Sequence, residues 1–289
     1  MTDQPTTSVP SSTARPARRP HVPAVRVGPS PTPRQRLHQL VYLRDVTLHL
    51  VGRELAARHR DSLFGWLWSL TPALLQLLVT HFLFTRVIPL GVENYAVFLL
   101  IGILAYNWFQ RSLTTASSVL VSSRTLVLRP GFPMVVLPVV SVLVGFVDYL
   151  LAFPILIVVL ALTTGLRIEL ALFPLVLLIQ FVLTLGFAWI VACLTVFLRD
   201  MRQIVGLVVG LGFWITPVFY RQRQVPEAFS LVYDLNPMAY VIEAHRGALL
   251  GEGLPSTAAL VGLSAFSLGV SFVGLLIFNR LRHGVPDRL

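Results

Sequence analysis

The 289-residue sequence contains no lysine, so all 23 of its basic residues are arginine. The absence of lysine excludes an ordinary P-loop, because the Gly-x-x-x-x-Gly-Lys-Ser/Thr motif needs a lysine amine on the nucleotide phosphates. Any ATP-driven work must therefore use a second polypeptide. The single cysteine, Cys193, excludes an internal disulfide and a cysteine-based metal cluster.

Charged residues of either sign are also scarce. They make up 12% of the chain, whereas hydrophobic residues make up 55% and the mean hydropathy is +0.75. Soluble domains contain roughly 25% charged residues. The composition therefore predicts an integral membrane protein, and the long apolar runs predict that it is all-α.

Six apolar windows approach the roughly 20 residues that a helix needs to cross a bilayer core. They are Trp66 to Ile88, Tyr95 to Leu113, Met134 to Leu162, Leu170 to Phe197, Ile204 to Tyr220 and Ala258 to Phe278. We therefore expect six transmembrane helices within a membrane domain over residues 66–278. Residues 279–289 form a short C-terminal tail.

The segment before the first window has two parts. Residues 1–36 are rich in proline and arginine and predict a disordered tail, because they bury too little apolar surface to fold. Residues 37–65 place leucines and valines on a broad helical arc that also contains arginines. This pattern predicts an amphipathic helix at the membrane interface, and a helix packed on other protein is the alternative.

Arginine is unevenly distributed between the two sides of the predicted domain. With the N-terminus inside, ten arginines precede the first window and eight more fall on the same side, which gives 18 against five on the other side. Because cytoplasmic segments carry the excess of arginine, both termini are predicted to be cytoplasmic.

The connection from Arg221 to Pro255 is the long outer one. It predicts two short helices, the first from Pro226 to about Tyr233, the second with Asn236 as N-cap and Pro237 as first residue, ending near Gly251. We expect a helical hairpin that dips back toward the outer membrane face. A lid without a role in transport is the alternative.

Few side chains suggest chemistry. Asp148 lies inside the third window, where a carboxylate is expensive, so we expect an arginine or polar partner on a neighbouring helix, with a proton relay as the alternative. Glu243 and His245 are too close in sequence for helical metal ligation, and no metal site is predicted. Glu243 and Arg246 suggest a local ion pair. Aromatic residues near the ends of the windows suggest membrane anchors or a wall for stacking sugars.

Several stretches together resemble polysaccharide-exporting ABC-2 type permeases, the exporters of O-antigen, teichoic acid and galactan. The resemblance rests on Glu54 to Pro72, Phe197 to Ile204, Thr216 to Tyr220, Val225 to Glu227, Leu235 to Pro237, and Glu243 with Arg246. It covers residues 37–278. An acidic residue at Asp148 also fits the pattern.

The resemblance implies a transport subunit without an ATPase site of its own, in a bacterial cell membrane. It would pair with a second copy of itself and with two ATPase chains that bind ATP and magnesium, and it would carry no cofactor itself. The implied cargo is a polyprenyl-pyrophosphate-linked polysaccharide, and no nucleic acid partner is implied.

The resemblance also implies residue roles. The ATPase would contact a coupling helix within Ser117 to Arg129, including Arg124, and the loop at Arg199 and Asp200. Arg53, Arg58 and Arg60 are candidates for attracting the pyrophosphate, and membrane topology or lipid binding is the alternative for each. Candidates for lining the glycan path are Trp68, Trp214, Phe219, Tyr220 and Asp148. Candidates for the outer gate are Pro226, Asn236, Pro237, Glu243 and Arg246.

Other functions stay open at this stage. An ABC-2 exporter of drugs or small lipids shares most of these features. A membrane enzyme acting on lipid-linked sugars would need clustered acids or histidines at one membrane face. A proton-coupled carrier would depend on Asp148.

Overall fold

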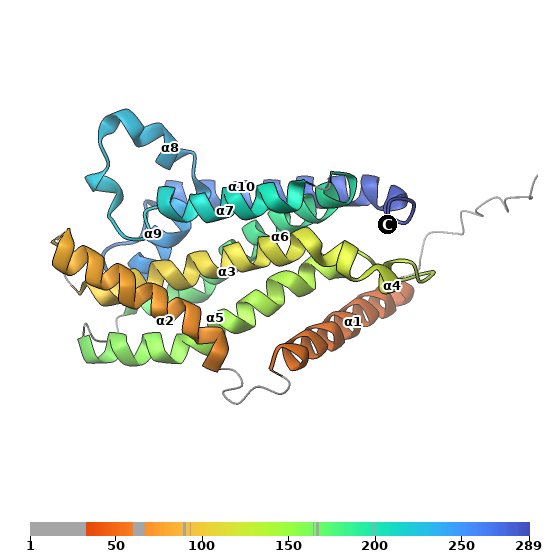
Figure 1. Ribbon diagram of the computed structural model, residues 1–289, viewed down its shortest axis with the longest axis horizontal. Helices are drawn as coiled ribbons and strands as arrows, with labels where there is room; N and C mark the ends of the chain where they lie inside the picture. Colours follow the sequence, from red (N-terminus) through yellow and green to blue (C-terminus); the bar gives the residue numbers. More distant parts are fainter. Residues whose placement is uncertain are drawn as a thin grey trace, which may run out of the picture. The chain divides into compact units, whose positions relative to one another are not determined.

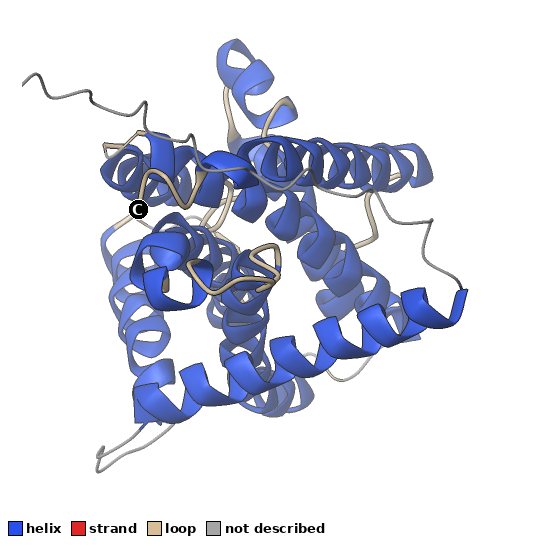
Figure 2. Cartoon of the chain, turned by 90° about the vertical axis from the view of Figure 1, so that its right-hand side faces the viewer, coloured by secondary structure: helices blue, strands red, loops and turns tan. Residues whose placement is uncertain are grey.

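The computed structural model describes residues 33–59, 67–88, 91–92, 94–163, 165, 168–198 and 200–289. Within these ranges the chain consists of helices and the loops that join them, without a strand (Figure 2). The all-α prediction is thus confirmed for the described part of the chain. The chain divides into two units, residues 1–39 and residues 40–289. Of the predicted disordered tail, residues 1–32 lie outside the described residues, and residues 33–36 are helical instead.

Ten α-helices and five shorter helical turns follow one another in the described chain. The α-helices are α1 (Pro33–His59), α2 (Leu67–Phe82), α3 (Tyr95–Ser122), α4 (Arg124–Val127), α5 (Val136–Thr163), α6 (Phe173–Phe197), α7 (Met201–Ile215), α8 (Ser230–Asp234), α9 (Pro237–Leu250) and α10 (Thr257–Leu281). The turns are η1 (Leu83–Val87), η2 (Ile168–Leu172), η3 (Gln222–Gln224), η4 (Glu227–Phe229) and η5 (Arg282–Gly284).

Five of the six predicted windows form helices that are long and apolar enough to cross a membrane. They are Leu70–Val87, Tyr95–Ser122, Val136–Thr163, Glu169–Phe197 and Thr257–Gly284. The remaining window forms α7, which has only 15 residues. The prediction that this helix reaches Tyr220 was wrong, because Pro217 forces Thr216 into an extended conformation (φ −70°, ψ 141°) and ends the helix. The six-span count stays a prediction.

Helix α3 lies at the centre of the second unit. It packs against α2, α5, α6, α7 and α9 (Figure 1). Apolar residues occur on all sides of its first half, and most of them are buried, which is typical of a helix surrounded by others. Gln180 of α6 donates a hydrogen bond from its amide Nε2 to the carbonyl of Ala105 at 2.8 Å, while its Oε1 is buried without a hydrogen-bond partner.

Helices α6 and α10 approach each other through two glycines. A Cβ added at Gly186 would lie 2.6 Å from the amide nitrogen of Ser271, and a Cβ added at Gly274 would collide with the carbonyl oxygen of Gly186. Small residues at such positions allow close backbone approach between membrane helices. The backbones of α6 and α10 are therefore in direct contact at these two glycines.

The second unit has two distinct ends. At one end, α4, the start of α5 and the ends of α6 and α10 share an apolar cluster that contains Leu120, Val127, Val196, Phe278 and Val285 (Figure 1, near the mark C). At the opposite end lie the start of α3, α8 and α9. Loops between successive long helices therefore alternate between the ends, as a chain crossing a membrane repeatedly requires.

Both short helices predicted in the long loop have a helical counterpart in the structure. The second is confirmed: the Asn236 side chain accepts a hydrogen bond from Met238 N, Pro237 is the first residue of α9, and Gly251 ends it with φ 66°. The first lies where it was predicted, since Pro226 caps a helical segment from Glu227 to Asp234. This segment is divided between the turn η4 and the five-residue helix α8.

From Leu40 onward, α1 runs beside the first half of α5. Val51 lies in one apolar cluster with Val136, Val140 and Val144 of α5. The predicted apolar arc is divided, since Leu43, Leu50 and Leu55 pack against buried residues whereas Leu40, Val41 and Leu48 are exposed. An interface role for this helix stays a prediction.

Candidate functional site

An open cavity of about 410 Å³, lined mainly by polar residues, lies where the end of α1 meets α2 and α3. Its lining consists of polar side chains and one proline: Arg58, Pro72, Gln76, Asn107, Gln110, Arg111, Thr114 and Thr115. We call it the arginine cavity. Polar and ionisable groups at membrane depth are costly and mark substrate or ion sites. Such a set within otherwise apolar helices makes the cavity a candidate functional site.

Helix α3 supplies most of the lining. Asn107, Gln110, Arg111 and Thr114 follow the i, i+3, i+4, i+7 spacing, which places them on one face of the helix. From α2, Gln76 accepts a hydrogen bond at 3.1 Å from Nδ2 of Asn107. The two helices are thus joined by their polar faces at the cavity wall.

Asp148 of α5 lies beside the arginine cavity and pairs with arginine, as expected. Its Oδ2 lies 3.3 Å from Nη1 of Arg58 and 3.6 Å from Nη1 of Arg111. Glu54 Oε1 lies 3.5 Å from Nε of Arg58 at i,i+4. A smaller cavity of about 20 Å³ shares Asn107 and Arg111 with the arginine cavity and reaches Asp148. The carboxylate itself is buried, with 6% of its side chain exposed.

The other predicted head-group residues do not join this group. Arg53 is exposed on α1 and does not line the cavity. Arg60 lies outside the described residues. Of the two that the structure describes, Arg53 and Arg58, it brings Arg58 together with a second arginine, Arg111.

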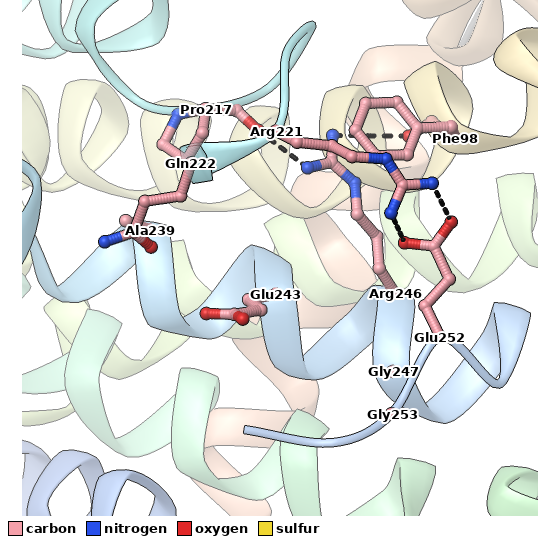
Figure 3. A pocket seen from close by; sticks show the side chains of 10 residues that line it. All are labelled: Phe98, Pro217, Arg221, Gln222, Ala239, Glu243, Arg246, Gly247, Glu252 and Gly253. Carbon is pink, nitrogen blue, oxygen red and sulfur yellow. Dashed lines mark hydrogen bonds and ion pairs between the residues drawn. The ribbon is translucent and has the colours of Figure 1, made fainter. Parts of the chain in front are cut away.

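A second group of polar residues surrounds Arg246 at the opposite end (Figure 3). The buried guanidinium donates to the carbonyl oxygen of Pro217 at 2.8 Å and also to those of Val218 and Phe98. It stacks on the Phe98 ring, with 3.4 Å between Cζ and the ring centroid. Desolvation lowers the pKa of Arg246 to about 9, so the group stays charged at neutral pH.

This arrangement corrects the predicted ion pair between Glu243 and Arg246. The carboxylate of Glu243 points away from the guanidinium in Figure 3, because Arg246 is engaged by three carbonyls. Glu252 pairs instead with Arg221, with Nη1 2.8 Å from Oε2. The Arg221 guanidinium also lies over Phe98, at 5.3 Å from the ring centroid. A cavity of about 220 Å³ lies between these side chains.

His245 is wholly buried beside Arg246. Its Nδ1 lies 2.8 Å from the carbonyl of Val241, and its Nε2 has no hydrogen-bond partner. The rings of Tyr149 and Phe173 contact it edge-on. Burial lowers the pKa of His245 to about 4, against an opposing contribution of the Val241 hydrogen bond. The histidine is therefore neutral in the folded chain.

We expect this histidine to destabilise the protein in acid. An unfolded histidine takes up a proton near pH 6.5 that the folded chain resists down to about pH 4, so stability should fall as the pH drops between these values. Melting temperatures in detergent, measured from pH 7.5 to 4.5, should fall more steeply for the wild type than for His245→Gln. Parallel curves for the two proteins would show that His245 is not the source.

The aromatic residues predicted to line the glycan path differ in their exposure. Trp68 and Trp214 are exposed, at 55% and 58%, whereas Phe219 is buried. Tyr220 is half-buried, and its hydroxyl lies 2.7 Å from both the carbonyl of Ile215 and the hydroxyl of Tyr233. Phe219 packs between Trp214 and Tyr220, so these three rings form one cluster at the end of α7.

The predicted ATPase contacts lie at the end that holds the C-terminus. Arg124, Arg129 and Asp200 are exposed there, and Arg199 lies outside the described residues. Ser117 is buried, and its hydroxyl donates to Thr114 O of the same helix. Of the predicted coupling segment, residues up to Ser122 continue α3, and only α4 is a separate helix.

Of the predicted gate residues, only Arg246 is buried, and Asn236 caps α9. Asn236 Nδ2 also donates to Thr216 Oγ1 at 2.9 Å, which ties the start of α9 to the end of α7. Pro226 and Glu243 are exposed, and Pro237 is half-buried.

Sequence reasoning missed several members of both groups. Gln76, Asn107 and Gln110 were not singled out, although the polar spacing on α3 could have identified two of them. Arg111 was considered only for topology, and Phe98, Arg221 and Glu252 were not considered as partners. No sequence signal joins Phe98 to Arg246, or Arg221 to Glu252, because each contact connects distant segments.

Comparisons with known proteins agree on one family. The family model described as ABC-2 type transporter matches residues 46–250. An O-antigen export system permease protein RfbA of Myxococcus xanthus is 32% identical over 256 residues, which cover 88% of this chain and 98% of the relative. Two RfbA proteins of Klebsiella pneumoniae with the same description are each 29% identical and cover 87% of this chain and 98% of the relative.

Proposed function

Because this chain belongs to the ABC-2 type transporter family, we propose that it is the permease subunit of an ATP-driven exporter of polyprenyl-pyrophosphate-linked polysaccharide. The observation that carries the proposal is the extent of similarity to O-antigen export permeases, which covers 98% of each relative. The arginine cavity supports it, because paired arginines suit a phosphate-bearing cargo.

The proposed topology has six spans with both termini in the cytoplasm and α1 at the inner face. Helix α7 would be the fifth of the six spans in chain order: 15 residues extend about 22 Å, and the bend over residues 216–220 would complete the crossing toward the outer side. The arginine imbalance and the alternation of loops between two ends support this orientation. In a bacterium, the membrane would be the inner, or cell, membrane.

The proposed motor is a separate ATPase, present in two copies, that binds ATP and magnesium. Arg124, Arg129, Arg199 and Asp200 would contact it from the end of the molecule where α4 lies. Ser117 would act from within α3, because its side chain is buried. This chain itself would need no cofactor.

The proposed complex also contains a second copy of this chain. The surface of α7 suits the seam, or interface, between the two copies, since a Cβ added at Gly206 or Gly210 would meet nothing within 4 Å. Leu207, Leu211 and Trp214 on the same helix are exposed and apolar. A partner helix could approach these glycines closely.

In the proposed cycle, closure of the ATPase pair moves the α4 ends, and the two copies part along their seam. The lipid-linked glycan would enter from the inner leaflet and pass Trp68, Trp214 and Tyr220, with Phe219 behind them. The α8–α9 segment would gate its release, with Pro226, Asn236, Pro237, Glu243 and Arg246 as the gate residues. Aromatic faces can stack on successive sugar rings without reading their order.

Purification from the native membrane tests this function. We expect a soluble P-loop chain to co-purify in near-equimolar amount, and we expect cells that lack this chain to lose a surface polysaccharide. The double variant Arg124→Glu, Arg129→Glu should release the ATPase, whereas Arg86→Glu at the other end should retain it. An intact permease without any ATPase, or a deletion strain with normal surface glycan, would contradict the proposal.

A further inference from the structure

The arginine cavity has the composition of an anion site. Two arginines contribute donors in a planar fork, and the side-chain amides of Asn107 and Gln110 add N–H groups that can donate to oxygen, whereas the Thr114 hydroxyl already donates to Gln110 O. Its volume of about 410 Å³ exceeds what a single ordered water needs. The cavity is therefore both large enough and suitably lined for a phosphate-bearing group.

Asp148 is a poor permanent partner for these arginines. Its distances to Arg58 and Arg111, 3.3 and 3.6 Å, are longer than the 2.7–2.9 Å usual for charge-assisted hydrogen bonds. One carboxylate oxygen, Oδ2, serves both guanidinium groups, while Oδ1 is buried without a hydrogen-bond partner. A buried carboxylate with an unsatisfied oxygen is held at an energetic cost. A better acceptor can therefore replace it on the arginines.

We infer that the arginine cavity binds the phosphate or diphosphate head group of a lipid, with Arg58 and Arg111 as its ligands. Asp148 acts as the internal counter-anion that occupies both arginines while the cavity is empty. A phosphate group offers several oxygens to the two forks at once, whereas Asp148 offers one. The inference rests on the proposed function for the nature of the cargo.

The location of the cavity favours a lipid over a free anion. Arg58 belongs to the end of α1, and Pro72 and Gln76 belong to α2. Exposed Leu75 and Val79 flank Gln76 on α2, one residue before it and three residues after it, so an apolar chain can lie beside the cavity. A head group in the cavity can thus keep its apolar chain against α2.

Binding of radiolabelled farnesyl diphosphate to the full-length protein in nanodiscs, with any co-purifying chains, tests the inference. Arg58→Gln and Arg111→Gln should each weaken binding by about tenfold or more, because each removes charge-assisted hydrogen bonds. Asp148→Asn should tighten binding by about fivefold, since it removes the competing anion. Arg44→Gln is the matched control on α1. It removes an exposed arginine that pairs with Asp45, far along the helix from the cavity, and should change nothing.

Two further arms keep the outcome clear. Arg58→Lys and Arg111→Lys retain the charge opposite Asp148 but lose the planar fork, so they should bind at least several-fold more weakly at normal protein level. If Asp148→Asn fails to fold, binding to these lysine variants shows whether the two arginines are the ligands.

Competition with unlabelled inorganic pyrophosphate, farnesol and phosphatidylglycerol identifies the source of the phosphate. Competition by farnesyl diphosphate and phosphatidylglycerol but not by farnesol supports a lipid head group, and competition by pyrophosphate alone overturns the lipid assignment.

Unchanged binding in all arginine variants would overturn the site, and weaker binding in a folded Asp148→Asn would overturn the counter-anion role. Failure of the inference is distinguishable from failure of the proposed function. If the deletion strain loses its surface glycan but the variants bind as the wild type does, only the site is wrong. If the variants behave as expected but surface glycan persists in the deletion strain, the phosphate site stands and the export function is wrong.

Discussion

Replacing Arg246 with methionine is expected to remove most of the folded protein. Methionine fills a similar volume but donates nothing, so the loop carbonyls of Pro217 and Val218 lose their donor inside the protein, while Phe98 O keeps its helical hydrogen bond within α3. Leaving buried acceptors without partners costs about 1–3 kcal/mol for each group, and a total on the order of 3–5 kcal/mol is expected. Arg246→Lys should recover little, because an ammonium cannot serve three carbonyls and stack on Phe98 in the same geometry.

Arg221→Met provides the matched control. It makes the same chemical change beside the same ring, but Arg221 is partly exposed and pairs with Glu252 near the surface. Such pairs contribute roughly 1 kcal/mol or less. Fluorescence-detected size exclusion and melting temperature measure both variants. If Arg246→Met melted as high as Arg221→Met, Arg246 would not be the residue that holds the loop after α7 against α3 and α9.

Gly274→Ala is expected to disrupt the packing of α10 on α6. The added methyl group would collide with the carbonyl oxygen of Gly186, which is backbone and cannot rotate away as a side chain could. Overpacking of this kind costs roughly 1–3 kcal/mol, and the upper end is expected because both contact surfaces are helix backbone. Gly186→Ala should behave similarly, since its Cβ would lie 2.6 Å from Ser271 N.

Gly269→Ala is the control on the same helix. A Cβ at Gly269 meets nothing within 4 Å. Alanine there should leave stability unchanged or raise it by up to about 1 kcal/mol, through its better helix propensity. Melting curves of the two variants in one detergent give the comparison. Equal melting temperatures for Gly274→Ala and Gly269→Ala would mean that α6 and α10 separate readily, contrary to their observed contact.

Local signals explain what the sequence predicted well. The long helices follow from apolar length, and α9 follows from Asn236, Pro237 and Gly251, whose capping roles depend only on immediate neighbours. The end of α7 was missed because hydropathy continues through Pro217 while the backbone cannot continue as helix.

The two candidate sites depend on contacts between distant segments. Asp148 could be expected to find an arginine, but which arginine depends on how α1 and α3 pack against α5. Arg246 was expected to pair with the nearest acid in sequence. Its actual partners are a ring on α3 and carbonyls of a loop, because a buried guanidinium is satisfied by the acceptors nearest in space. Periodicity on α3 predicts a polar face but not the second wall of the cavity.

The length of α3 has a mechanical consequence. Its 28 residues contain no proline and extend about 42 Å, from Tyr95 beside the α7–α9 end to Ser122 just before α4. Tyr95 donates a hydrogen bond to Phe219 O at 2.9 Å. About one turn further along α3, the Arg246 guanidinium stacks on the Phe98 ring. If a helix of that length tilts as a rigid body about one end, its other end must move. A tilt of about 5° around one end would displace the other end by about 4 Å, without a hinge anywhere along the helix.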